Sequence, residues 1–210
     1  MEIKLIVISL FAFAISCKSQ LTRWESSKTI ANVEFEKVRY KILNHDTIMI
    51  IGLLNKETVI ENFPCAKDYV YFNNECKIQN FRLAKPFFIG TTEIPANTWV
   101  SLERYGYYVC SLPEESTFDV YTCMKGNGKD GPVTVFYSNG ALRSFFSPED
   151  IKIGEIYCAG GKSNEIGFLK NGSLEYCTIS IDHNINDVKY KRGSVILFDL
   201  NGNVSAVKEK

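Results

Sequence analysis

Three seven-residue segments decide the fold: FYSNGAL at residues 136–142, FLKNGSL at 168–174 and FDLNGNV at 198–204. Each consists of an aromatic residue, two variable residues, Asn-Gly, one variable residue and an aliphatic one. Asn-Gly between apolar residues is a strong β-hairpin signal, and a two-residue hairpin turn needs positive φ at both positions. The sequence therefore predicts a hairpin repeated about every 30 residues, with the turn residues Asn139, Gly140, Asn171, Gly172, Asn201 and Gly202.

The same pattern extends upstream in a weaker form. Residues 99–102 (WVSL) match the strand before the hairpin, and residues 69–72 (YVYF) precede a degenerate turn at Asn73-Asn74. A repeat of this size cannot bury its own apolar face, so neighbouring repeats stack into one core. Helical periodicity is nearly absent. We therefore predict an all-β fold of stacked β-hairpin repeats over residues 68–210, either an elongated meander or a rolled half-barrel.

Two further strand candidates precede the repeats. Residues 33–43 (VEFEKVRYKIL) alternate between apolar and polar, and residues 47–54 (TIMIIGLL) are almost wholly apolar. Repeat proteins need a capping element at the end of the stack. We therefore expect a small N-terminal β cap over residues 31–67.

The composition excludes several classes of protein. The 210 residues include 24 basic and 24 acidic side chains, so the net charge is zero and gives no electrostatic case for nucleic acid as a partner. Hydrophobic residues make up 45% of the chain, which is enough for a folded core and excludes general disorder. We expect a folded monomer.

The N-terminus has the features of an export signal. Residues 1–16 (MEIKLIVISLFAFAIS) combine one lysine with an apolar run that is too short to cross a bilayer; a buried strand is the alternative. Cys17 follows in the order Ala14-Ile15-Ser16-Cys17, which resembles a bacterial lipobox, while ordinary cleavage after Ser16 also fits. We predict a lipidated Cys17 and a tether over residues 17–30 that hold the protein on the cell envelope, at the outer membrane, by acyl chains.

The other six cysteines form an even set: Cys65, Cys76, Cys110, Cys123, Cys158 and Cys177. An even number of cysteines outside the cytoplasm suggests disulfides, with 15 possible connectivities. The preferred pairing is sequential, which gives Cys65–Cys76, Cys110–Cys123 and Cys158–Cys177. Free buried thiols are the alternative.

These repeats and cysteines resemble those of exported spirochaete lipoproteins, leptospiral ones above all, in which an aromatic-x-x-Asn-Gly hairpin alternates with a cysteine-bearing strand. The resemblance covers the chain from about Asp68 onward, although Ala14 stands where a lipobox usually has leucine. The units are also similar, more distantly, to MORN-type repeats of bacterial antitoxin-like proteins. The lipoprotein resemblance implies a location and a shape, and it implies no enzymatic activity.

Catalytic and metal-binding signals are sparse. His183 follows Asp182, an order that can orient an imidazole as a base, but adjacent strand residues face opposite sides and no G-x-S-x-G motif accompanies them. Glycine-rich residues 127–130 lack the order of a calcium loop. The acid pairs at 114–115 and 149–150 follow prolines and are explained as turn residues. We expect no catalytic residue, no metal and no cofactor.

Aromatic residues offer the better functional material. Tyr105, Tyr107 and Tyr108 cluster near one turn, and Phe87-Phe88 and Phe145-Phe146 are adjacent pairs in which only one ring can face the core. Exposed rings on a β surface suit contact with protein or glycan. The preferred function is therefore a non-catalytic lipoprotein that binds a host or envelope protein or glycan. The alternatives are a periplasmic or secreted hydrolase that uses His183 and an inhibitor-like or antitoxin-like MORN-type module.

Overall fold

A computed structural model describes residues 19–103, 106–127 and 131–208, and this part of the chain is all-β. The predicted signal peptide over residues 1–16 and the predicted lipidation site Cys17 lie outside these residues. None of the described residues forms a helix long and apolar enough to cross a membrane. The predicted fold class is confirmed, and of its two forms the structure takes the open meander.

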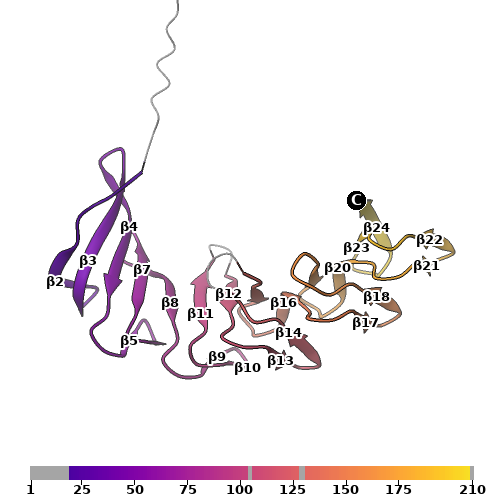
Figure 1. Ribbon diagram of the computed structural model, residues 1–210, viewed down its shortest axis with the longest axis horizontal. Helices are drawn as coiled ribbons and strands as arrows, with labels where there is room; N and C mark the ends of the chain where they lie inside the picture. The colour runs from indigo at the N-terminus through magenta and orange to yellow at the C-terminus, as the bar shows by residue number, and fades with distance from the viewer. Residues whose placement is uncertain (1–18, 104–105, 128–130, 209–210) are drawn as a thin grey trace, which may run out of the picture.

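The main layer is one long antiparallel sheet that curves without closing (Figure 1). Neighbouring strands follow one another in sequence, apart from the small hairpins between them. In spatial order the strands are β1 (Gln20–Leu21), β3 (Val33–Leu43), β4 (Asp46–Leu53), β7 (Tyr69–Asn73), β8 (Ile78–Arg82), β11 (Trp99–Leu102), β12 (Tyr108–Ser111), β15 (Thr134–Phe136), β16 (Leu142–Phe146), β19 (Glu165–Phe168), β20 (Leu174–Thr178), β23 (Val195–Phe198) and β24 (Val204–Lys208), with β2 (Glu25–Ile30) paired to β3.

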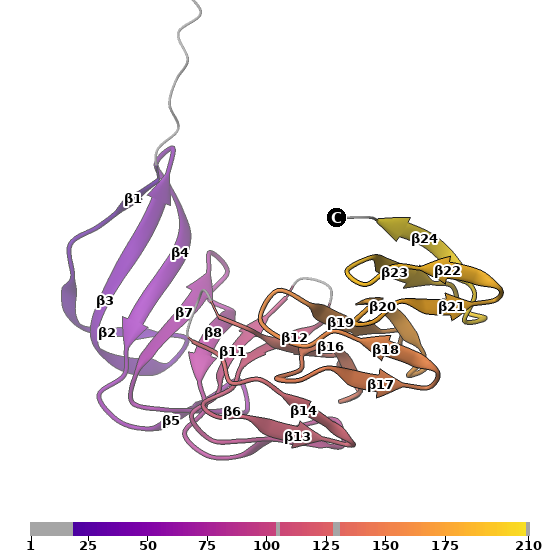
Figure 2. The same ribbon diagram turned by 45° about the vertical axis from the view of Figure 1, so that its right-hand side comes forward.

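The second layer consists of five short hairpins on the outer side of the curve (Figures 1 and 2). Each one connects two strands of the main sheet. They are β5–β6 (Thr58–Ile60, Phe63–Cys65), β9–β10 (Phe87–Ile89, Thr92–Ile94), β13–β14 (Ser116–Phe118, Tyr121–Cys123), β17–β18 (Ile151–Ile153, Ile156–Cys158) and β21–β22 (His183–Ile185, Val188–Tyr190). The repeated unit is therefore one long hairpin of the main sheet plus one crossing hairpin.

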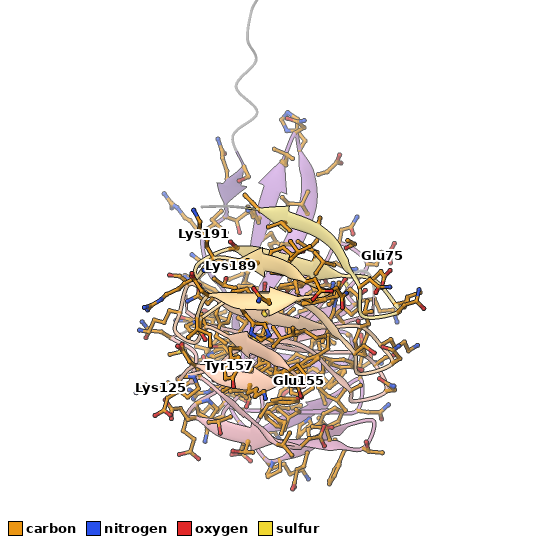
Figure 3. All side chains as sticks on the ribbon, turned by 90° about the vertical axis from the view of Figure 1, so that its right-hand side faces the viewer. Glu75, Lys125, Glu155, Tyr157, Lys189 and Lys191 are labelled. Atoms are coloured by element: carbon orange, nitrogen blue, oxygen red, sulfur yellow. The ribbon has the colours of Figure 1, made fainter. Side chains whose placement is uncertain are left out.

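The crossing hairpins run along the outer side of the sheet, from the strand ends on one side toward the hairpin turns on the other. At the tip of β9–β10, the Thr92 hydroxyl donates a hydrogen bond to the Gly140 carbonyl in the β15–β16 turn, at 2.8 Å. Figure 3 is a view along the stack of repeats. Lys125 and Lys191, just after the crossing hairpins β13–β14 and β21–β22, lie on one side of it, and Glu75, in the β7–β8 turn, lies on the other. Contacts between repeats thus join segments about 50 residues apart in sequence.

The core fills the space between the two layers. In β7, Val70 and Phe72 are buried while Tyr69 and Tyr71 face the other way. In β16, Phe145 is fully buried and Phe146 is half-exposed, so one ring of the predicted pair faces the core. Phe145 stacks on Phe168 at 6.0 Å between ring centroids, and both rings contact Tyr121 of a crossing hairpin. Aromatic residues therefore join the sheet to the hairpin layer.

The three Asn-Gly turns are hairpin turns as predicted, but their conformation differs from the expected one. Only the glycines have positive φ (89° at Gly140, 84° at Gly172 and 79° at Gly202), and the pairing register shifts between the last two residues of each first strand. This is a longer turn that closes with a glycine bulge. The two-residue turns with positive φ at both positions instead lie elsewhere, as at Glu61-Asn62 and Asn186-Asp187 in crossing hairpins.

The expected N-terminal cap is continuous with the repeats. Strands β3 and β4 belong to the same sheet, and β4 pairs directly with β7 over five residues. Gly52 in β4 lies under the Phe35 ring, and a Cβ there would overlap that ring. The first strands therefore extend the main sheet toward the N-terminus.

Candidate functional site

The face of the main sheet that the crossing hairpins leave open carries a trough of about 780 Å³. It lies over the N-terminal half of the sheet, and its lining includes Arg39, Lys41, Ile51, Tyr69, Tyr71 and Trp99. Strand register explains how these side chains gather. Arg39 lies opposite Ile51, Ile51 opposite Tyr71, and Tyr71 opposite Asn80, so residues far apart in sequence form one row across the sheet.

Three aromatic residues, Tyr69, Tyr71 and Trp99, line the trough, and Trp24 packs on one of them. Trp24 stacks on Tyr69 with ring centroids 5.9 Å apart, and Tyr71 meets Trp99 edge to face at 6.5 Å. Neither Tyr71 nor Trp99 is buried, although both lie on central strands. The two strands that carry Tyr69, Tyr71 and Trp99 are held by backbone pairing on both sides. The rings are thus fixed in position and accessible.

The charged residues that line the trough are cationic. They are Arg39 and Lys41, both on β3. The Arg39 guanidinium lies over the Trp24 ring at 4.4 Å, and its Nε is buried without a hydrogen-bond partner. The nearby carboxylate of Asp68 is paired with Arg82 at 3.1 Å. The trough therefore combines aromatic surface with positive charge.

The open face farther along the chain is occupied by its own side chains. The Arg143 guanidinium lies 5.3 Å from the Tyr107 ring centroid and pairs with Glu175 at 3.4 Å, and the Tyr137 hydroxyl donates to the Phe168 carbonyl. The Tyr176 ring lies over Gly167, where a Cβ would overlap it. Burial and the neighbouring Glu165 carboxylate raise the pKa of Tyr176 above its ordinary value. The charged and polar groups on this part of the face therefore pair with one another.

The predicted tyrosine cluster is divided by the fold. Tyr107 packs against Tyr137 at 5.7 Å, whereas Tyr108 packs against the core. Tyr105 lies outside the described residues. The trough residues Tyr69 and Tyr71 were predicted only as strand residues. Their alternation with Val70 and Phe72 was the signal that could have placed them on the open face.

The Asp182 carboxylate does not orient the His183 imidazole as a catalytic pair requires, because each side chain has other partners. The His183 ring meets Tyr157 edge to face at 5.6 Å. The Asp182 carboxylate pairs with Lys189 at 3.3 Å and accepts a hydrogen bond from the Arg192 backbone N–H, and these contacts lower its pKa. Asp182 therefore stabilises the crossing hairpin β21–β22 at its base.

The remaining polar candidates lie on the hairpin layer. Glu115 and Glu149, from the two predicted acid pairs, line a second hollow of about 590 Å³. Asp150 accepts a hydrogen bond from the Gly160 backbone N–H, as expected of a turn residue. The described residues contain no group of three or more His, Cys, Asp or Glu side chains arranged to hold a metal ion. Residues 128–130 of the glycine-rich loop lie outside the described residues.

None of the six described cysteines is disulfide-bonded in this structure, and the fold separates two of the three sequential pairs. Cys65 forms a backbone β-bridge with Leu83, which follows the end of β8, whereas Cys76 precedes the start of β8. The length of the extended strand, roughly 16 Å, therefore separates Cys65 from Cys76. Cys123 docks on β16 through the backbone hydrogen bond from Met124 to Phe146, and β15 lies between β16 and β12, the strand that carries Cys110. Cys158 and Cys177, in contrast, are close enough that their interaction, together with burial, raises the pKa of Cys177.

No protein-family model, curated protein or solved structure matches this chain.

Proposed function

We propose that the chain is a non-catalytic bacterial lipoprotein, anchored to the cell envelope, whose β-repeat body binds a ligand in the trough on the open face. The observation that carries the binding function is the set of accessible rings beside two cations that have no paired carboxylate in the lining. Buried rings would stabilise the core, but Tyr71 and Trp99 are left accessible on the far side of the sheet from it.

An acidic oligosaccharide fits this trough better than a protein does. A volume of about 780 Å³ lies in the range of sites for small ligands. The central strands have no free backbone edge to which an extended peptide could add. The C–H faces of sugar rings pack on aromatic side chains, while Arg39 and Lys41 complement carboxylates on the sugars.

Binding is tested with the full chain in gels that contain polygalacturonate, a polymer of uronic acid, or amylose as a neutral polymer. We expect polygalacturonate alone to slow migration. Trp99→Ala removes a packing surface worth about 0.5–1.5 kcal/mol, so it weakens binding by about 2- to 10-fold. Arg39→Gln removes a charge, so it weakens binding and reduces the dependence of binding on salt.

The matched controls are Tyr157→Ala and Lys152→Gln. These residues form a similar ring–cation pair, 5.2 Å apart, on the opposite layer, where Figure 3 shows Tyr157, and both variants should bind like the unmodified protein. Migration unaffected by polygalacturonate, as for a protein that binds only other proteins, would refute the acidic-sugar ligand. Equal retardation of the trough variants and the controls would place the site elsewhere.

The membrane anchor is tested separately by labelling growing cells with radioactive palmitate. We expect label on the full chain and its complete loss in Cys17→Ala, because acyl chains attach to this thiol and each buried CH₂ contributes about 0.8 kcal/mol to membrane binding. Cys76→Ala, which removes a half-exposed thiol in the β7–β8 turn, should keep the label. An unlabelled wild-type protein would contradict the membrane anchor, and the proposal that the trough binds a ligand would still stand.

A further inference from the structure

The end of a crossing hairpin docks on the main sheet in the same way in three repeats. Backbone hydrogen bonds run from Ala66 to Arg82, from Met124 to Phe146 and from Ala159 to Thr178, at 2.7–2.8 Å. In each case a cysteine immediately precedes the donor: Cys65, Cys123 and Cys158. These three cysteines therefore occupy equivalent positions between the layers, and all three are fully buried.

The residue that faces this cysteine from the sheet differs between repeats. It immediately precedes the acceptor residue, so it is Phe81 for Cys65, Phe145 for Cys123 and Cys177 for Cys158. At this register position two repeats have a phenylalanine, and the third has a second cysteine. Among the described residues this is the repeat in which the shared geometry brings two cysteines together.

Strand register places Cys158 diagonally across from Cys177. Cys158 forms an antiparallel bridge with Ile179, flanked by hydrogen bonds from Ala159 to Thr178 and from Ser180 to Tyr157. Cys177 lies two residues before Ile179 and so on the same face of the strand as the residue opposite Cys158, and its interaction with Cys158, together with burial, raises the pKa of Cys177. Diagonal neighbours on paired strands lie about 7–8 Å apart, so a disulfide between them forms when the backbone of the docking hairpin moves toward the sheet.

We infer that Cys158 and Cys177 form the one disulfide that ties the hairpin layer to the sheet, and that the other four described cysteines remain thiols. Closure breaks two S–H bonds and forms one S–S bond. The two electrons and two protons pass to an external disulfide, which is reduced to two thiols. Both sulfurs are buried in the folded chain, so closure takes place while the hairpin docks.

The bridge lies where the core is weakest. Cys158 and Cys177 belong to the large core cluster, and the next residues toward the C-terminus begin a separate cluster of four buried residues: Ile179, Ile185, Ile196 and Phe198. So small a cluster buries little apolar area, and a covalent link there limits opening of the last repeats.

The test refolds the reduced full chain, in mild detergent, in a buffer of reduced and oxidised glutathione, so that it does not depend on export or on the trough. Free thiols are then alkylated and the protein is digested with trypsin. We expect the peptides 153–162 and 171–189 to appear joined by a disulfide. Cys65, Cys76, Cys110 and Cys123 should be alkylated.

Variants show whether the bridge depends on this geometry. In Cys158→Ser, Cys177 should be fully alkylated. Dithiothreitol should lower the melting temperature of the wild type by about 6–12 °C and should leave that of Cys158→Ser unchanged. Cys123→Ser, the equivalent change beside a phenylalanine, should keep the bridge. Alkylation of all six thiols in the wild type, or a bridge between any other pair, would overturn the inference.

Discussion

Replacing Phe145 with alanine is expected to lower the free energy of unfolding by about 3–5 kcal/mol. The Phe145 side chain is fully buried and contacts Phe168 in the sheet and Tyr121 in the crossing hairpin β13–β14. Its removal leaves a cavity at the junction of the two layers, where close-packed neighbours cannot fully collapse. Denaturation with guanidinium chloride, followed by fluorescence or circular dichroism, measures the loss.

Phe146→Ala is the matched control, because it removes the same side chain one residue farther along. Phe146 faces the open side of the sheet opposite Glu165 and is half-exposed. Less apolar area is returned to water and the neighbours can relax, so we expect a loss below about 1.5 kcal/mol. Equal losses in the two variants would mean that the core does not lie between the layers.

Gly140→Ala is expected to cost about 3–5 kcal/mol, whereas Gly172→Ala, in the same sequence motif, should cost only about 1–2 kcal/mol. Both glycines have positive φ, so both variants incur the backbone strain. A Cβ at Gly140 would also overlap the Ile89 carbonyl oxygen at the tip of the crossing hairpin β9–β10, while a Cβ at Gly172 meets nothing within 4 Å.

The two alanine variants are compared by guanidinium denaturation, with Thr92→Val as a third measurement. Thr92 donates to the Gly140 carbonyl, so its loss should cost about 0.5–1.5 kcal/mol by itself. In Gly140→Ala the displaced hairpin tip already breaks that bond, and the added cost of Thr92→Val should then be close to zero. Equal effects of Gly140→Ala and Gly172→Ala would show that the tip does not contact the turn.

Much of the repeat could be read from local pattern. Alternation in residues 69–72 predicted a strand, and the Asn-Gly segments predicted hairpins at Gly140, Gly172 and Gly202, because glycine at these turns is a requirement of the local backbone. The turn type was wrong. The glycine bulge depends on how the flanking strands are registered, and the register is set by pairing across the sheet.

The candidate site could be predicted much less well. The trough joins Arg39, Tyr71 and Trp99, which are separated by 32 and 28 residues in sequence and meet only through strand register. The tyrosines near residue 107 looked like a cluster because they are neighbours in sequence. On a strand such neighbours face opposite sides, and the fold sent Tyr108 to the core.

The sequence by itself determined that the chain is all-β, that it repeats about every 30 residues, and that at most one ring of each adjacent aromatic pair can face the core, because these depend on interactions a few residues long. Tertiary structure alone decided that short hairpins cross behind the sheet, that Gly140 but not Gly172 meets one of them, and that Cys65, Cys123 and Cys158 dock at equivalent positions on the sheet. The physical reason is that stacking joins one repeat to the next: a contact between repeats depends on the register and curvature of the whole sheet, and no single repeat contains that information.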